Sequence, residues 1–233
     1  MSEIFNVFPT TIYADRIENH FVYKKLYYET NLYSKYDYVE NERSSTVSEG
    51  QVDVDPLLHL EPTLYPLFGE IISHVKKYVL EILEYKDIFN YAITKSWISR
   101  ARDNKEIPWH IHSTSHVSFV YFLNIPPNSH QTTFLNRENA NGLFLGSNSQ
   151  NTVDDATMVK KYNDLNSRTF FIHPEEGVVL LFPSTVSHGT KAVDENFKDE
   201  RLAIVGDVNL ILKEEFLHHS MGLIDEKYWM KFS

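Results

Sequence analysis

The chain has 233 residues and a formal net charge of −10, with 42% hydrophobic and 23% charged residues. This length suits one domain with a sizeable core, and the composition is that of a globular rather than a disordered protein. The acidic balance argues against a general nucleic-acid-binding surface, and the absence of cysteine excludes disulfides and thiolate metal ligands. Any metal must therefore be held by His, Asp or Glu.

The first part of the chain predicts a strand followed by helices. Its N-terminus has no basic start followed by an apolar run, and no stretch reaches the roughly 18 apolar residues of a membrane span. A cytoplasmic protein is the expectation from these two observations. Residues 7–16 predict a strand and residues 20–32 a helix. Over 62–84 the apolar residues recur at intervals of three and four, which predicts an amphipathic helix packed on a sheet.

Beyond residue 90 the pattern becomes that of strands. Alternation predicts a strand over 91–102 with every second residue on one side. The residues expected on that side are Tyr91, Ile93, Lys95, Trp97 and Ser99. Further strands are expected over 117–125, 132–135, 142–145, 169–173, 178–182 and 201–212.

Many short strands separated by turn residues are typical of a sandwich or a barrel. We therefore predict a mainly β protein with flanking α-helices: a double-stranded β-helix (a cupin-like jelly roll) with one or more helices packed on one sheet. The chain is expected to form a single domain over 1–233. Its parts are the N-terminal strand and supporting helices (1–89), the jelly-roll core (90–212) and a C-terminal tail (213–233).

Histidines gather in the segment Pro-Trp-His-Ile-His-Ser-Thr-Ser-His, which ends at His116. His110 and His112 are two residues apart, so an extended backbone places both imidazoles on the same side, close enough for one metal ion. One ligand from a distant strand would complete a set of three and leave positions for substrate and oxygen. The pair alone is equally compatible with two unrelated surface histidines.

Two later residues extend this set. His188 follows the apolar run 178–182 and a proline turn, a place where a histidine is more often structural than a ligand. Arg201 opens the strand 201–212, and an Arg at the mouth of a barrel can bind a carboxylate through two hydrogen bonds, which Lys does less well. The alternative role for Arg201 is a surface salt bridge with Asp199 or Glu200.

The ordered set His110-x-His112, His188 and Arg201 resembles the 2-oxoglutarate- and Fe(II)-dependent oxygenases. In particular, it resembles the small 2OG-Fe(II) oxygenases of bacteria and tailed phages. Further matching stretches are Val-Phe-Pro-Thr at 7–10, Pro-Glu-Glu-Gly-Val-Val-Leu-Leu-Phe-Pro at 174–183 and Arg-Leu-Ala-Ile at 201–204. The resemblance covers both ends of the expected core and most of residues 90–212.

The resemblance implies Fe(II) as the metal and 2-oxoglutarate as cosubstrate. By position, His110 and His188 match the iron-binding histidines, and Arg201 matches the residue that binds the distal carboxylate of 2-oxoglutarate. His112 stands where most members carry Asp or Glu, so it is either a third ligand in a neutral set or a residue behind the metal. Ser118 and Tyr121, on the strand after the histidine segment, are further candidate cosubstrate contacts.

The implied activity is that of a dioxygenase, expected to be a hydroxylase, which couples decarboxylation of 2-oxoglutarate to oxidation of an unidentified protein or small-molecule substrate. Ala203 stands where some of these oxygenases carry Ser, so that hydroxyl contact is absent or comes from elsewhere. Two alternatives stay open: a 2-oxoglutarate-independent three-histidine dioxygenase of the cupin type, and a non-catalytic jelly-roll binding module. The first has no need for Arg201. The β-rich edges also suggest a homodimer.

Overall fold

The computed structural model describes residues 3, 9–30, 32, 57–101, 106–136, 160–163 and 165–216. Its strands are β1 (Tyr13–Arg16), β2 (Phe89–Ala101), β3 (Val117–Asn124), β4 (Gln131–Leu135), β5 (Thr169–Ile172), β6 (Val178–Pro183), β7 (Ser187–Lys191) and β8 (Arg201–Leu212). They form a five-stranded sheet in the order β1-β6-β3-β8-β2 and a three-stranded sheet in the order β5-β4-β7. Neighbouring strands in both sheets are antiparallel. The expected mainly β architecture is confirmed.

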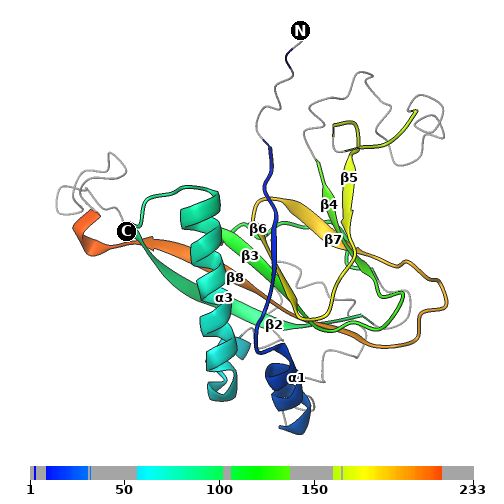
Figure 1. Ribbon diagram of the computed structural model, residues 1–233, viewed down its shortest axis with the longest axis horizontal. Coiled ribbons are helices and arrows are strands. Elements are labelled where there is room, and N and C mark those ends of the chain that lie inside the picture. Colours follow the sequence, from blue (N-terminus) through cyan, green and yellow to red (C-terminus); the bar gives the residue numbers. More distant parts are fainter. Residues whose placement is uncertain are drawn as a thin grey trace, which may run out of the picture.

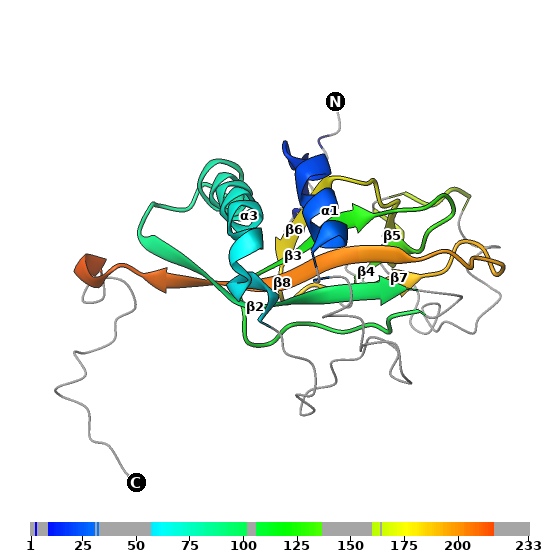
Figure 2. The same ribbon diagram turned by 90° about the horizontal axis from the view of Figure 1, so that it is seen from below.

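Both longer helices lie on one face of the five-stranded sheet (Figures 1 and 2). They are α1 (His20–Glu29) and α3 (Tyr65–Lys77); short 3-10 turns form at Leu58–Leu60, Pro62–Leu64 and Glu214–Phe216, and one π turn, Tyr78–Ile82, continues α3. Leu67, Ile71 and Val75 of α3 are fully buried in the core on this face. Each such side chain contributes ~1.5–3 kcal/mol on burial. The predicted amphipathic helix is therefore confirmed.

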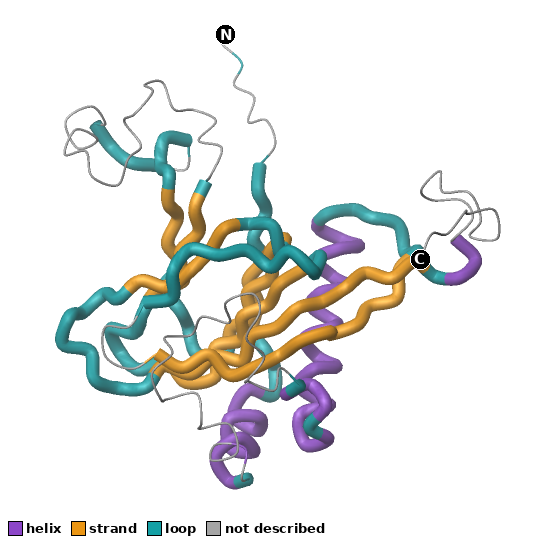
Figure 3. Tube along the Cα trace, turned by 180° about the vertical axis from the view of Figure 1, so that it is seen from behind, coloured by secondary structure: helices purple, strands orange, loops and turns teal. Residues whose placement is uncertain are grey.

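The other face of the same sheet meets the three-stranded sheet, and seen from that side the strands lie in front of the helices (Figure 3). Phe122 of β3 and Phe182 of β6 are fully buried there and pack with Phe134 of β4. Because β3 is buried on both faces, its sequence is almost continuously apolar instead of alternating. The space between the two sheets is the interior of the jelly roll.

Strand β2 contains a bulge that the sequence does not reveal. Its pairing with β8 shifts register between Ile93 and Lys95. Before the shift, Ile93 packs against the core on the helix side. After it, the ring of Trp97 lies 5.8 Å from the ring of His112, on the opposite face. The expectation that alternate residues over 91–99 share one side is therefore wrong, because an extra residue reverses the alternation.

The strand expected over 7–16 is limited to Tyr13–Arg16, because the described residues 9–12 form no strand. The other expected elements in the described residues are found with small differences at their ends. Strand β7 was not anticipated: Ser-His-Gly-Thr-Lys carries little apolar pattern, although four of its five residues are buried. The expected strand over 142–145 and residues 7–8 of the first strand lie outside the described residues. In the described part of the chain, no helix is both long and apolar enough to cross a membrane.

Candidate metal and cosubstrate site

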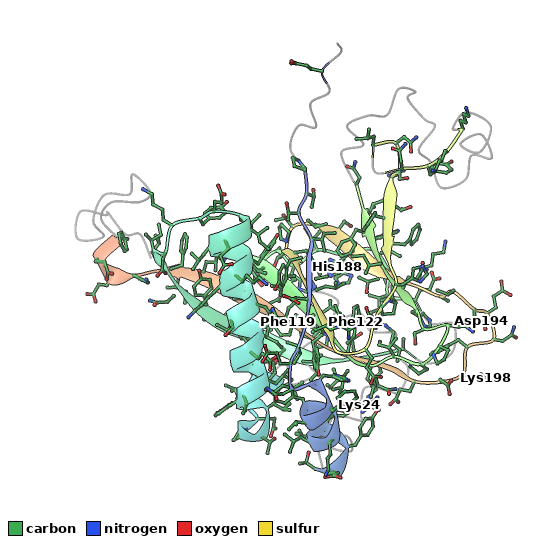
Figure 4. All side chains as sticks on the ribbon, viewed as in Figure 1. Lys24, Phe119, Phe122, His188, Asp194 and Lys198 are labelled. Atoms are coloured by element: carbon green, nitrogen blue, oxygen red, sulfur yellow. The ribbon has the colours of Figure 1, made fainter. Side chains whose placement is uncertain are left out.

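Two histidines of one segment and a third from a distant part of the sequence lie close together between the sheets. His110, His112 and His188 each offer one ring nitrogen, and these nitrogens lie within 4.8 Å of one another. The ring centroids are 4.3 Å apart for His110 and His188, and 5.0 Å apart for His112 and His188. Figure 4 labels His188 on β7. The structure thus brings together all three residues that the sequence indicates as metal ligands.

Backbone hydrogen bonds hold the histidine segment beside His188. The N–H of His110 donates to the carbonyl of His188 (2.9 Å), and the N–H of His188 donates back to the carbonyl of His110 (3.0 Å). The histidine segment therefore runs antiparallel beside β7. The close approach requires Gly189, because a Cβ there would lie only 2.5 Å from the carbonyl oxygen of Ile107.

Hydrogen bonds fix which nitrogen of each ring is free. The Nδ1 atom of His110 lies 2.9 Å from the carbonyl oxygen of Pro108, and that of His188 lies 2.9 Å from the carbonyl oxygen of Val186. A carbonyl only accepts, so each Nδ1 carries the proton and each Nε2 keeps its lone pair. His112 places its Nδ1 2.5 Å from a carboxylate oxygen of Asp207, with the same result. All three rings therefore present Nε2 as the ligand atom.

Burial keeps the imidazoles of His188 and His110 neutral. Loss of solvation lowers the pKa of His188 to about 3, and the neighbouring His110 lowers it further. Burial likewise lowers the pKa of His110. Both rings are therefore neutral at neutral pH, with a free lone pair on Nε2, which is the form that binds metal.

A hydroxyl and carboxylate cluster supports His112 from behind. The Ser118 hydroxyl lies 3.2 Å from Nδ1 of His112, 3.2 Å from a carboxylate oxygen of Asp207 and 2.8 Å from the hydroxyl of Ser184. Ser118 thus lies behind the histidine, which is not the direct cosubstrate contact expected from the sequence. Asp207 was missed, although a lone acidic residue inside the apolar strand 201–212 is a visible signal of a buried charge.

Arg201 is buried, and some of its hydrogen-bond donors lack partners among the described residues. It is 1% exposed, its guanidinium carbon lies 5.4 Å from the ring centre of Phe122, and Nε and Nη1 have no hydrogen-bond partner in the described part of the chain. The alternative of a surface salt bridge with Asp199 or Glu200 is not found among the described residues, because Arg201 is buried; Glu200 instead pairs with Arg100 at 3.2 Å. Burial lowers the pKa of Arg201 to about 10, so it stays cationic at neutral pH. An unpaired buried cation is costly and favours an anionic ligand.

Other orphaned polar atoms lie on the three-stranded side. Both ring nitrogens of His130 and the hydroxyl oxygen of Thr132 are buried without a hydrogen-bond partner among the described residues. Burial lowers the pKa of His130, and the charge of Arg201 lowers it further. Thr132 is two residues from Phe134, so both side chains point between the sheets. Sequence reasoning named neither residue.

The side chain of Tyr121 does not point into the space between the two sheets. It belongs to the core on the helix side, and its hydroxyl lies 2.7 Å from Nδ1 of His20 in α1. Ser118 and Tyr121 are three residues apart on β3, and side chains with odd spacing point to opposite faces of a sheet. The expectation of a cosubstrate contact by Tyr121 is corrected on this geometry.

Residues 95–207 match the family model described as "Putative 2OG-Fe(II) oxygenase". This part of the chain, just under half of its length, therefore matches a 2OG-Fe(II) oxygenase domain. The match spans His110, His112, His188 and Arg201. This family uses Fe(II) and 2-oxoglutarate, and the residues fit both groups: three converging Nε2 atoms for the metal, and unsatisfied guanidinium donors for a carboxylate.

Two of the solved structures similar to this chain have TM-scores above 0.5 and share its fold. AviO1 from Streptomyces viridochromogenes Tue57 is 13% identical with a TM-score of 0.52, over 86% of this chain and 90% of that chain. The non-heme alpha ketoglutarate dependent epimerase SnoN from nogalamycin biosynthesis is 12% identical with a TM-score of 0.51, over 86% and 76%. A 2OG-Fe(II) oxygenase family oxidoreductase from Burkholderia pseudomallei is 13% identical with a TM-score of 0.39, over 65% of this chain and 54% of that chain. No curated protein matches the chain. The predicted jelly-roll fold is confirmed.

Proposed function

We propose that the protein is an Fe(II)- and 2-oxoglutarate-dependent hydroxylase in which His110, His112 and His188 bind the metal and Arg201 binds the distal carboxylate of 2-oxoglutarate. The observation that carries the proposal is the combination of three converging Nε2 atoms with a buried guanidinium whose Nε and Nη1 have no hydrogen-bond partner among the described residues. The substrate, a protein side chain or a small molecule, is unidentified.

The residues of the chain orient the reactants and exclude water. When bound, Fe(II) and 2-oxoglutarate supply the oxidising chemistry. The backbone bonds at Pro108 and Val186 fix the rings of His110 and His188 before metal arrives. The ring of Phe182 lies 4.7 Å from that of His188, so one wall of the site is apolar.

The cosubstrate contacts beyond Arg201 are assigned to the three-stranded side. His130 and Thr132 have unsatisfied buried atoms there, and the charge of Arg201 acts on His130. A bound carboxylate near Arg201 offers acceptors for donors that otherwise lack partners. These two residues replace Tyr121 as candidate contacts.

An anaerobic titration with Fe(II) and 2-oxoglutarate tests the proposal. The visible charge-transfer band of the iron chelate should form in the wild type and be lost in His188→Ala and Arg201→Ala. His116→Ala is the matched control, because His116 lies in the same segment, is exposed and is outside the set of three. This variant should keep the band.

The remaining outcomes distinguish the alternatives. Iron binding without a band, unchanged by Arg201→Ala, indicates a 2-oxoglutarate-independent cupin-type dioxygenase. Binding of neither iron nor 2-oxoglutarate indicates a non-catalytic binding module. Cytoplasmic location, a homodimer and the lack of nucleic acid as partner stay predictions.

A further inference from the structure

Asp207 is a buried carboxylate placed directly behind one of the three histidines. It is 3% exposed, and one of its oxygens lies 2.5 Å from Nδ1 of His112. In the described part of the chain, the imidazole of His112 is the one basic group within 4.0 Å of the Asp207 carboxylate. Lys95 lies opposite Asp207 in the strand register, but its ammonium is 3.4 Å from the hydroxyl of Thr114. No lysine or arginine among the described residues forms an ion pair with this carboxylate.

Comparison among the three histidines shows what Asp207 adds. His110 and His188 direct their Nδ1 protons to backbone carbonyls two residues earlier in the chain. A neutral acceptor is thus sufficient to fix a ring and its tautomer. At His112 the acceptor is a carboxylate, which fixes the ring in the same way and also adds a negative charge. The set of three imidazoles has no negative charge of its own.

We propose that Asp207 is a positioning residue of the metal site: it holds His112 with Nε2 toward the metal and supplies, from behind that ring, the negative charge that three neutral ligands lack. The inference rests on the proposed function, because it assumes that the three histidines bind a divalent cation. A buried carboxylate without a cation is costly, and a metal bound to His112 offsets that cost through the imidazole. The alternative is that Asp207 only ties β8 to β3 through Ser118.

Metal affinity separates these two roles. Calorimetric titration with Co(II), without 2-oxoglutarate or substrate, should give an affinity about 10–100-fold weaker for Asp207→Asn and for Asp207→Ala than for the wild type. Asp207→Asn keeps the shape and an acceptor oxygen but removes the charge, so its loss measures the charge. Asn209→Ala is the matched control: it removes a 3.0 Å side-chain partner of His116 on the same strand and should bind Co(II) like the wild type.

Each outcome is decisive. Wild-type affinity in Asp207→Asn overturns the charge-supplying role, and wild-type affinity in both variants overturns the whole inference. No Co(II) binding by the wild type is instead a failure of the proposed function.

A second measurement needs no variant of Asp207. Nitrogen-15 NMR of the metal-free wild type should show His112 protonated at Nδ1, with the signal assigned by its loss in His112→Gln. Protonation at Nε2 would contradict the inference.

Discussion

At the scale of single residues, the site depends on atoms whose partners are fixed or missing. The three Nδ1 atoms are bonded, and the guanidinium of Arg201 has free donors in a buried place. A lysine at this position keeps the charge but loses the planar pair of donors.

Arg201→Lys should therefore weaken 2-oxoglutarate binding by about 10–100-fold, which corresponds to the loss of one charged hydrogen bond. Metal affinity should stay unchanged, because Arg201 offers no metal-binding atom. The measurement is a titration of the Fe(II) protein with 2-oxoglutarate under nitrogen, with Arg16→Lys, an exposed arginine on β1, as control. Equal 2-oxoglutarate affinity in Arg201→Lys and the wild type would contradict the proposal that Arg201 binds the distal carboxylate.

The sequence pattern indicates candidate ligands of the metal and of the cosubstrate better than residues that only position those ligands. The spacing of His110 and His112 indicates a candidate metal pair, and the resemblance to the oxygenases adds His188 and Arg201 as candidates. Asp207 could not be paired with His112, because their contact depends on how β8 lies against the histidine segment. The expectation that Tyr121 contacts the cosubstrate fails because its odd spacing from Ser118 puts it on the other face of β3.

At the scale of elements, the approach of the histidine segment to β7 sets the geometry. The two backbones exchange hydrogen bonds between His110 and His188, and Gly189 leaves room for the carbonyl of Ile107. A side chain at this position would displace the segment that carries two of the three histidines.

Gly189→Ala should destabilise the fold by about 1–3 kcal/mol and weaken Co(II) binding, because the new Cβ would lie 2.5 Å from the carbonyl of Ile107. Gly69→Ala is the matched control: nothing lies within 4 Å of its added Cβ, and at this exposed position of helix α3 it should stabilise by about 0.5–1 kcal/mol. Urea unfolding and Co(II) titration measure both effects. Similar stability and Co(II) affinity for the two variants would contradict this account of Gly189.

Periodicity predicted the elements with strong apolar patterns and missed those that lack them. Helix α3 and strands β3 and β8 follow from their apolar residues. Strand β7 does not, since it is buried through small and polar side chains. The bulge in β2 is invisible to any alternating pattern, yet it turns Trp97 toward His112.

At the scale of the whole molecule, the two faces of the five-stranded sheet have different roles. The helices cover one face and build most of the core, whereas the other face meets the smaller sheet and holds the site. Apolar content predicted that a sheet would carry helices, but strand order and the pairing of sheets depend on long-range contacts that local sequence does not specify.

The most direct test is a crystal structure grown anaerobically with Co(II) and 2-oxoglutarate, with the metal located by its anomalous scattering. The account predicts one Co(II) ion about 2.1 Å from Nε2 of each of His110, His112 and His188, with the distal carboxylate of 2-oxoglutarate on Arg201. A metal bound through other atoms, or 2-oxoglutarate bound away from Arg201, would contradict it.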